Sequence, residues 1–281
     1  MLAAIDFGLS NMKIVYASAH GEVLSMHCRP ALRHVDVDAV RAALAVDGHR
    51  PEDFKVLVMT GGRSAGLPDF IDATPLHKVS EIEAIGRGGL LAAGSLFDAA
   101  LVVSCGSGTA AIAVRPGDVH HTSGTAVGGG TLCGLGQLLL GIADAVEIDT
   151  LSSCGNATVL DLTLQEATHG PLGAIPPDAT AVNFGKAAEA ARRGVLERAD
   201  VAASLVTMIA QTVALVAIGA ARTEKLERIV LVGRLPSLPA VATQLLRTAQ
   251  FYGANFTIPA EGVFAPVRGA LAAAISRRNW R

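Results

Sequence analysis

The densest group of residues that could bind phosphate lies between His121 and Gly136, where the sequence reads HTSGTAVGGGTLCGLG. Its glycines allow the backbone to adopt positive φ angles and to approach a ligand closely. A helix that begins near Gly129 or Gly130 would point free N–H groups and the positive end of its dipole at an anion. A flexible surface loop is the alternative, but the flanking sequence is apolar enough to be buried. The stretch therefore predicts a phosphate-binding loop.

A carboxylate at a strand end is the second chemical feature. Residues 2–5 are apolar and end at Asp6, and residues 14–17 form another apolar run, so the sequence predicts a β-hairpin. At this position Asp6 can hold Mg²⁺ through water, while Ser10 and nearby N–H groups contact phosphate. An ordinary hairpin in which Asp6 only serves the turn is the alternative. A similar strand–turn–strand pattern spans residues 99–114, with Gly106-Ser-Gly-Thr109 in its turn.

Two acidic residues begin a predicted helix that runs from Val79 to about Gly94. Glu81 and Glu83 are two positions apart, so their side chains point in different directions and only one is expected to face a site. The helix dipole at this end would favour their charged forms and slightly lower their basicity. Both could instead be solvated acids that only stabilise the helix start.

Strands and helices alternate along the chain, which predicts a mixed sheet covered by helices. Residues 35–44 have helical spacing, and the buried strand 55–59 leads into Thr60-Gly61-Gly62, where ligands of such folds gather. The two hairpins each begin one half of the chain and suggest a duplicated βββαβα architecture. Near the C-terminus the pattern predicts a strand over residues 228–232 that ends in Gly233, and a last helix over residues 267–274 that contains Gly269.

A long helix is predicted from Asp200, as its cap, to Thr223. Its faces are too apolar for full exposure, so we expect half of it to pack on a second copy of the chain. Polar residues interrupt the apolar run of residues 201–221, so no stretch reaches the roughly 20 apolar residues that span a bilayer.

Composition indicates a soluble cytoplasmic protein. Of its 281 residues 51% are hydrophobic, and the formal charge of −2 gives no reason to expect a nucleic acid or an anionic membrane as partner. No signal peptide is visible at the N-terminus. The four cysteines form no C-x-x-C pair, which argues against a zinc or iron–sulfur site and suits reduced thiols: Cys28, Cys105, Cys133 and Cys154.

The order of these motifs resembles the acetate-kinase/hexokinase/Hsp70/actin superfamily. Within it, the chain resembles the type II (eukaryotic-like) pantothenate kinases in the segments 124–136 and 179–186 and in the spacing from Glu81 to Gly88. The resemblance covers nearly the whole chain. The resemblance implies an α/β protein with a two-lobed actin-like ATPase fold, made of duplicated ribonuclease-H-like domains with mixed sheets. We expect an N-terminal lobe over residues 1–98 and a C-terminal lobe over residues 99–281.

The resemblance also implies an activity, the ATP-dependent phosphorylation of the primary hydroxyl of pantothenate, which is the first step of coenzyme A synthesis. ATP and Mg²⁺ would be the cofactors and a homodimer the working form. Glu81 matches the catalytic glutamate that deprotonates the hydroxyl. The implied nucleotide-binding positions are Asp6 (also the metal ligand), Gly8, Ser10, Lys13, Gly106, Ser107, Gly108, Thr109, Gly128, Gly129, Gly130, Thr131, Gly233 and Gly269, and the implied substrate-binding positions are His121, Thr125, Ala126 and Arg87.

Two departures from the family pattern bear on the substrate. The first hairpin reads Gly8-Leu9-Ser10 where the family has Gly-Gly-Thr, and His120-His121 stand where an arginine would grip the pantothenate carboxylate. Histidine cannot offer the planar two-point fork of arginine. Either the carboxylate is held otherwise, for example by Arg87, or the acceptor is another alcohol such as pantetheine. A nucleotide-binding regulator or reactivator on the same fold is the third possibility.

Overall fold

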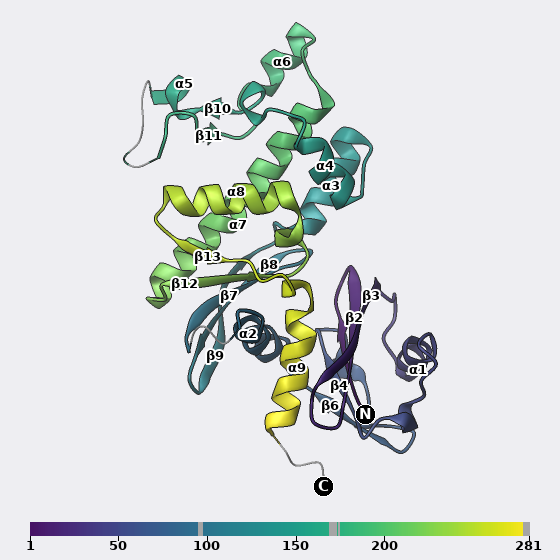
Figure 1. The fold of residues 1–281 in the computed structure, drawn as a ribbon. Helices are drawn as coiled ribbons and strands as arrows, with labels where there is room; N and C mark the ends of the chain where they lie inside the picture. The colour runs from purple at the N-terminus through teal and green to yellow at the C-terminus, as the bar shows by residue number, and fades with distance from the viewer. Residues whose placement is uncertain (95–97, 169–172, 174, 278–281) are drawn as a thin grey trace. The chain divides into compact units, whose positions relative to one another are not determined.

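The protein is described from a computed structural model, which covers residues 1–94, 98–168, 173 and 175–277 (Figure 1). Contacts within the chain group it into two compact units. The first unit contains Met1–Val102, Ile112–His121 and the segment from Pro259 onward, and the second contains Val103–Ala111 and Thr122–Ile258. The last segment thus belongs to the first unit, whereas the predicted lobes assigned it to the second.

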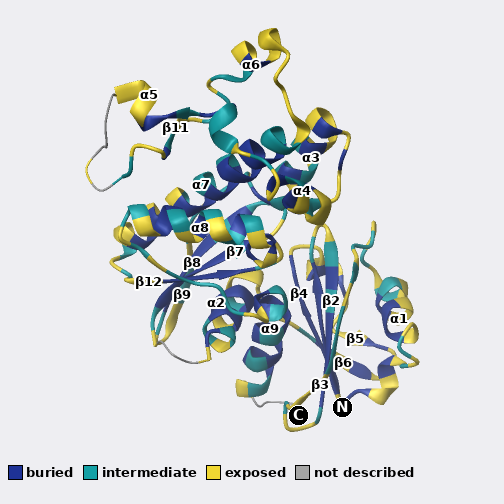
Figure 2. Cartoon of the chain, turned by 45° about the horizontal axis from the view of Figure 1, so that its top comes forward, coloured by how far each residue is buried: buried dark blue, intermediate teal, exposed yellow. Residues whose placement is uncertain are grey.

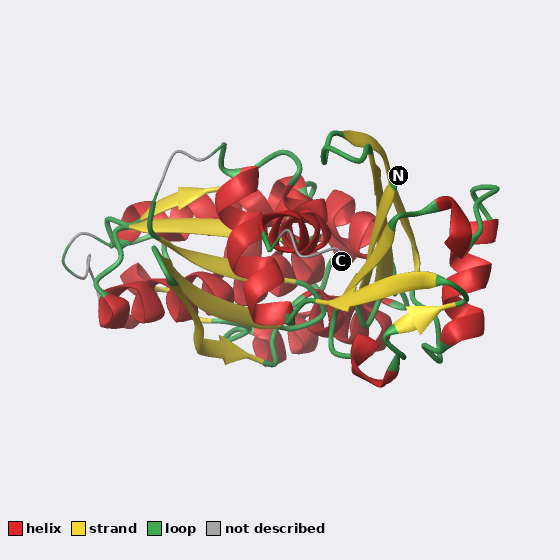
Figure 3. Cartoon of the chain, turned by 90° about the horizontal axis from the view of Figure 1, so that it is seen from below, coloured by secondary structure: helices red, strands yellow, loops and turns green. Residues whose placement is uncertain are grey.

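The first sheet has six strands in the order β3-β2-β1-β4-β6-β5. Figure 3 draws the strands of the protein in yellow and its helices in red. β1, β2 and β3 pair antiparallel, while β4 runs parallel to both β1 and β6. This is the mixed sheet that the alternating pattern predicts. The strands are β1 (Leu2–Phe7), β2 (Asn11–Ala17), β3 (Val23–Pro30), β4 (Val56–Thr60), β5 (Phe70–Ile71) and β6 (Thr74–Lys78).

The second sheet repeats this topology. Its order is β13-β12-β7-β8-β9, so β7, β8 and β9 correspond to β1, β2 and β3, and β12 lies beside β7 as β4 lies beside β1. The predicted duplication is therefore present. The strands are β7 (Ala100–Cys105), β8 (Thr109–Arg115), β9 (Asp118–Thr125), β12 (Arg228–Val232) and β13 (Asn255–Thr257), and β10 (Leu162–Thr163) pairs with β11 (Thr180–Val182) in a separate two-stranded sheet.

Nine α-helices lie within the described part of the chain. They are α1 (Val37–Ala45), α2 (Glu81–Ala92), α3 (Gly129–Leu140), α4 (Ala145–Ser152), α5 (Leu164–Thr168), α6 (Ala187–Arg193), α7 (Arg198–Glu224), α8 (Pro239–Phe251) and α9 (Ala265–Ser276). The glycine-rich stretch is not one loop, because its first residues form the end of β9 and its last begin α3.

Alternation along the strands gives the first sheet two buried faces. Ala3, Ile5, Leu57 and Met59 face one cluster, in which Val40 and Leu44 of α1 take part. Leu2, Ala4, Val56 and Val58 face the other cluster, which includes Ala84 of α2 and Val267 and Ala270 of α9. Since successive strand residues point to opposite faces, Asp6 and Thr60 continue the row that α2 and α9 cover.

Helices α2 and α9 approach each other through glycine. A Cβ atom at Gly88 would lie 1.8 Å from the carbonyl oxygen of Ala265, and one at Gly269 would lie 2.0 Å from that of Ala84. Gly89 is similarly close to Val102. The glycines therefore let α2 sit against α9 and the sheet, which sets the position of its first residue, Glu81.

Helix α7 is a core helix of the second unit, which corrects its predicted cap and removes the reason given for a subunit contact. It begins at Arg198 with Glu197 as its N-cap, and the Asp200 carboxylate instead accepts a hydrogen bond of 2.7 Å from the backbone N–H of Asn156. Most of its apolar residues are buried, and α3, α4 and α8 pack against it (Figure 2). Its apolar character thus gives no reason to expect a subunit contact.

The apolar composition of α7 also bears on the expectation that no segment is apolar enough to span a bilayer. The helix is long and apolar enough to cross a bilayer, which the interrupted run at residues 201–221 did not suggest. However, 67% of its most apolar window is buried inside the protein. The burial identifies it as part of the core.

We predict that Gly88→Ala destabilises the protein by about 2–3 kcal/mol, because the added methyl group forces α2 away from the α9 backbone. Gly219→Ala is the matched control, since this helical glycine of α7 is exposed and has open space around its Cβ position. It should be neutral or stabilising by up to about 1 kcal/mol. Urea unfolding measures both, and equal effects would contradict the role of Gly88 in the helix crossing.

Candidate active site

A polar row crosses the first sheet where its apolar face ends. Asp6 pairs in register with Lys13 of β2 and with Thr60 of β4. The preceding row on the same face consists of Val15, Ala4 and Val58, all of them buried. The three polar residues Lys13, Asp6 and Thr60, which we call the polar row, therefore lie side by side at the carboxyl ends of β1 and β4. This is the edge at which ligands of such sheets bind.

Asp6 is buried and ion-paired. Its side chain is 6% exposed, and its Oδ2 atom accepts a hydrogen bond of 3.0 Å from Nζ of Lys13. A buried carboxylate needs such a partner, because removal of its charge from water is costly. Gly61, with a φ of +90°, passes so close that a Cβ atom there would lie 3.0 Å from Oδ1 of Asp6 and 2.7 Å from the carbonyl oxygen of Phe7. Only glycine suits this position.

The turn of the first hairpin is exposed, with Leu9 at 68% and Ser10 also on the surface. Gly8 is required by the turn, since a Cβ atom there would lie 2.7 Å from the carbonyl oxygen of Asn11. Because Leu9 is mostly exposed, this departure from the family pattern lies outside the buried part of the site.

Glu81 is the first residue of α2, whose N-cap is Ser80, and it lies on the helix face of Ala84 and Ile85, which are buried. Its carboxylate lies near the backbone of Gly62, which favours its charged form. Partial burial raises the pKa of Glu81, and the negative charge of Asp6 raises it further, while Gly62 and Lys13 act in the opposite direction. The pKa of Glu81 is raised, whereas the helix dipole alone predicted a slightly lower basicity, so that expectation is wrong for Glu81. Burial is only partial, because the residue keeps part of its surface in contact with solvent.

Glu83 has different surroundings. Its carboxylate forms ion pairs with Nε of Arg87 at 2.9 Å and with Arg277 of the segment after α9 at 2.5 Å. Its side chain is only 18% exposed. Glu83 therefore ties α2 to the end of α9, and Arg87 is already engaged in this ion-pair group.

The residues around the polar row are compatible with Mg²⁺. Asp6 and Glu81 are close enough for their charges to raise the pKa of Glu81, and a divalent cation would relieve this repulsion. Over the described residues, no cluster of three or more histidine, cysteine or acidic side chains could hold a metal by itself. Mg²⁺ commonly needs only one or two carboxylates, with phosphate and water completing its ligands.

The second hairpin and the glycine-rich stretch form one hydrogen-bonded structure. The N–H groups of Gly129 and Gly130, at the start of α3, donate to the carbonyl oxygens of Gly106 and Ser107 at 2.8 and 2.9 Å. The helix begins where the sequence predicts, but these two N–H groups are not free for an anion. This part of the expectation is wrong, because the turn of the hairpin already satisfies them.

Close packing explains the glycines of this structure. A Cβ atom at Gly128 would lie 2.7 Å from the carbonyl oxygen of Ser107 and 2.8 Å from Cα of Gly108. Two threonines hold the connection: Thr109 donates to the Val127 carbonyl at 2.9 Å, and the hydroxyl of Thr131 donates to the Ala126 carbonyl at 3.3 Å. We call Gly106–Thr109 together with Gly128–Thr131 the glycine structure.

Gly233 repeats the geometry of Gly61 in the second unit. It follows β12, has a φ of +101°, and a Cβ atom there would lie 2.5 Å from the carbonyl oxygen of Cys105 at the end of β7. Gly233 therefore follows the strand beside β7 just as Gly61 follows the strand beside β1. The duplicated topology thus places a glycine turn at the carboxyl edge of each sheet.

The other predicted binding residues are spread over both units. His121 is exposed in the middle of β9, Thr125 ends that strand with its hydroxyl accepting from Val127 N–H at 3.2 Å, and Ala126 is exposed beyond it. Gly269 lies in the helix crossing described above. The structure brings Asp6, Lys13 and Glu81 together in the first unit, and places the glycine structure and Gly233 in the second.

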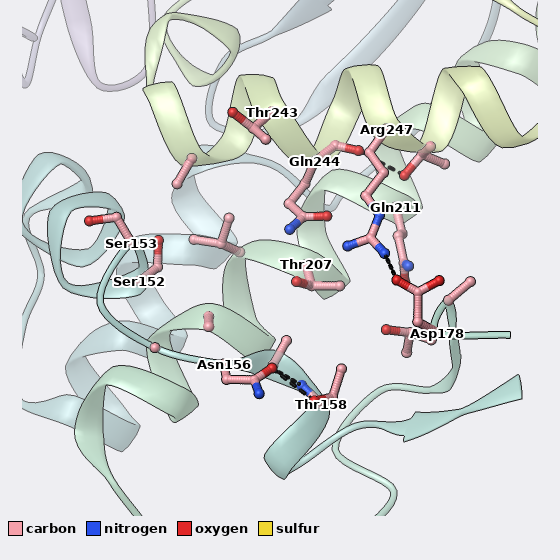
Figure 4. Close-up of a pocket in the computed structure, with 18 of the residues that line it drawn as sticks. Ser152, Ser153, Asn156, Thr158, Asp178, Thr207, Gln211, Thr243, Gln244 and Arg247 are labelled. Atoms are coloured by element: carbon pink, nitrogen blue, oxygen red, sulfur yellow. Dashed lines mark hydrogen bonds and ion pairs between the residues drawn. The ribbon is translucent and has the colours of Figure 1, made fainter. Parts of the chain in front are cut away.

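A cavity of about 400 Å³ lies within the second unit, between α7, α8 and the segments after α4 and before β11 (Figure 4). Neutral polar side chains dominate its lining, among them Asn156, Thr207, Gln211 and Gln244. At its edge Arg247 forms a 2.5 Å ion pair with Asp178. It contains none of the predicted site residues, and its four segments are too far apart in sequence for any local pattern to indicate it.

Asp161 is a buried acid that fixes the 179–186 segment. Its Oδ1 atom accepts the backbone N–H of Phe184 at 2.8 Å, and its Oδ2 atom accepts the hydroxyl of Thr180 at 3.1 Å. Burial raises the pKa of Asp161, although these hydrogen bonds oppose the change. The segment is therefore held by a structural carboxylate, and no pattern in the sequence indicated that residue.

Comparison with known proteins links these features to a family. The sequence model of the Fumble family matches residues 95–259, more than half of the chain. The type II pantothenate kinase of Bacillus cereus is 28% identical over 183 residues, covering 64% of this chain and just under two thirds (66%) of the relative. The type II pantothenate kinase of Oceanobacillus iheyensis is 27% identical over 233 residues, covering 82% of each chain.

Solved structures show the same fold. The activator of 2-hydroxyisocaproyl-CoA dehydratase from Clostridium difficile, with bound ADPNP, superposes with a TM-score of 0.69 at 14% identity and covers 98% of this chain and 94% of its own. A ROK family glucokinase from Streptomyces griseus, in complex with glucose and AMPPNP, gives a TM-score of 0.61 at 14% identity and covers 98% and 99%. The predicted fold class, a two-lobed actin-like ATPase fold with mixed sheets, is confirmed.

We predict that Gly128→Ala lowers both stability and ATP affinity, because its methyl group would push the start of α3 away from the second hairpin. The stability loss should be about 1–3 kcal/mol. Gly134→Ala is the control, since Gly134 lies in the same helix, is exposed and has open space at its Cβ position. Urea unfolding and equilibrium dialysis with ATP measure the two effects. Unchanged ATP binding in a destabilised Gly128→Ala protein would remove the glycine structure from the nucleotide site.

Proposed function

The chain belongs to the Fumble family, and from this premise we propose that it is an ATP-dependent pantothenate kinase that transfers a phosphoryl group to the primary hydroxyl of its acceptor. One observation carries the proposal beyond family membership: Glu81, with a raised pKa, lies close to the paired Asp6 and Lys13 at the carboxyl edge of the first sheet. The site thus brings together a base (Glu81), a carboxylate that can bind a metal (Asp6) and a cation (Lys13). These are the groups that phosphoryl transfer requires.

Each residue then has a defined task. Glu81 accepts the proton of the acceptor hydroxyl, and its raised pKa makes it a stronger base than an ordinary surface glutamate. Lys13 provides positive charge for phosphate oxygens, and Asp6 would hold Mg²⁺ through water. When bound, Mg-ATP supplies the phosphoryl group. We assign Gly8 and Ser10, the glycine structure, and Gly233 with Gly269 to nucleotide binding, as the family resemblance implies.

The carboxylate of pantothenate lacks an evident partner, which favours a second candidate acceptor. Arg87 is engaged with Glu83 at 2.9 Å, and His121 offers no bidentate fork. An uncharged acceptor such as pantetheine has no carboxylate to grip and would fit these positions, together with Thr125 and Ala126. A regulator without phosphoryl transfer is less consistent with the site, because it would not need a base such as Glu81.

We also propose a homodimer in the cytoplasm. Support for the dimer does not come from α7 but from apolar side chains exposed on α3 and α4, where Leu138 is 80%, Leu139 55% and Val146 48% exposed. Surface apolar residues gathered on neighbouring helices are typical of an interface. The unpaired cysteines suit a reducing compartment.

Coupled ADP release over a panel of alcohols, with pantothenate and pantetheine included, tests the function. We expect Mg-dependent turnover with at least one of the two. Glu81→Gln should lower kcat by roughly two to four powers of ten while ATP binding is retained, because only the proton acceptor is lost. Glu83→Gln is the matched control and should cost much less.

Two results would contradict the proposal. Absence of turnover with every alcohol, despite normal ATP binding, would favour the regulator. If Glu83→Gln were inactive and Glu81→Gln active, Glu83 and not Glu81 would be the base.

A further inference from the structure

The hydroxyl of Thr60 is buried and has no hydrogen-bond partner in the described part of the chain. Thr60 is 0% exposed, and within the described part of the chain its Oγ1 atom is the one buried side-chain oxygen or nitrogen that has no hydrogen-bond partner. A buried polar group without a partner costs roughly 1–3 kcal/mol, so such a group calls for an explanation. Valine has the same shape and would avoid this cost.

The place of Thr60 in the sheet suggests the explanation. It is the neighbour of Asp6 across β1 and β4, on the face where the preceding pair is Ala4 and Val58. Neighbouring strands lie about 4.8 Å apart, so side chains on one face at paired positions are within reach of each other. Asp6 thus has one potential hydrogen-bond donor on each side, Lys13 on β2 and Thr60 on β4.

Only one of these two donors is engaged in the structure. Lys13 donates to Oδ2 of Asp6 at 3.0 Å, whereas the Thr60 hydroxyl makes no bond. Phosphate oxygens carry more negative charge than a single carboxylate, so an incoming phosphate competes with Asp6 for the Lys13 ammonium. If Lys13 turns to phosphate, Asp6 remains buried and needs another donor, because a buried charge without partners is strongly unfavourable.

From this arrangement we propose that Thr60 is a positioning residue of the phosphoryl-transfer centre: when the Lys13 ammonium turns to phosphate, the Thr60 hydroxyl donates to the Asp6 carboxylate and holds it in place. The inference rests on the proposed function, since it requires a phosphate ligand beside the polar row. It deepens that function by giving a task to a residue outside the motifs of the hairpins and of α2.

The proposal predicts opposite effects on stability and on function. Thr60→Val keeps the shape and removes only the unpaired hydroxyl, so the ligand-free melting temperature should be unchanged or higher than that of the wild type. Affinity for Mg-ATP, or kcat with the acceptor, should fall roughly tenfold to a hundredfold, the usual loss for a hydrogen bond to a charged group. Thr60→Ser keeps the hydroxyl and should restore most of this loss.

The Lys13→Met variant provides a second test of the role of Thr60. Without the lysine, Asp6 must already use Thr60 in the ligand-free state. Adding Thr60→Val to Lys13→Met should then lower the melting temperature, although the same change does not lower it in the wild-type background. A purely structural threonine would produce equal shifts in both backgrounds.

The experiment compares wild type, Thr60→Val and Thr60→Ser by ligand-free thermal melting, by equilibrium dialysis with Mg-ATP and by coupled ADP release. The proposal is supported by unchanged melting, weaker nucleotide binding or turnover in Thr60→Val, and rescue in Thr60→Ser. It is overturned if Thr60→Val melts lower but binds and turns over normally, or if Thr60→Ser is as impaired as Thr60→Val. A wild type that binds Mg-ATP yet phosphorylates no alcohol would defeat the kinase function, and the binding and melting data would still decide the role of Thr60.

Discussion

The arrangement of this site depends on one buried carboxylate, that of Asp6. Asp6 is the last residue but one of β1 and lies where the apolar face of the first sheet ends in the polar row. A buried charge in that position requires partners. Lys13 supplies one on the neighbouring strand, Gly61 leaves room beside it, and Glu81 responds to it with a raised pKa. Glu81, the base that we propose, therefore owes part of its raised pKa to Asp6, and a larger part to its own partial burial.

Glycine packing controls where these charges lie. Gly88 and Gly269 let α2 and α9 meet at backbone distance, and the start of α2 carries Glu81. In the second unit, close packing at glycine likewise brings the hairpin at Gly106 against the start of α3. The fold thus uses its glycines chiefly to bring backbone segments together, and positions side chains by doing so.

Sequence patterns predicted the local features well. The hairpin around Asp6, the strand before Gly61 and the start of α3 at Gly129 all follow from apolar runs that end at glycine or polar residues. Long-range contacts could not be read in this way. Three features depend on segments far apart in sequence. They are the helices that bury α7, the carbonyl groups that accept the N–H groups of Gly129 and Gly130, and the membership of α9 in the first unit. The unpaired Thr60 hydroxyl likewise emerges only once β1 and β4 are paired.

The central claim is that Asp6 and Glu81 form one electrostatic unit, and the most direct test is the titration of Glu81 itself. Carbon-13 NMR of labelled glutamate carboxyl groups, with Glu81→Gln used for assignment, gives its pKa in the wild type and in Asp6→Asn. We expect a wild-type pKa above the ordinary glutamate value of about 4.3. It should fall in Asp6→Asn, because a negative charge is removed and Lys13 is released to act on Glu81. A pKa that stays the same or rises in Asp6→Asn would contradict the account.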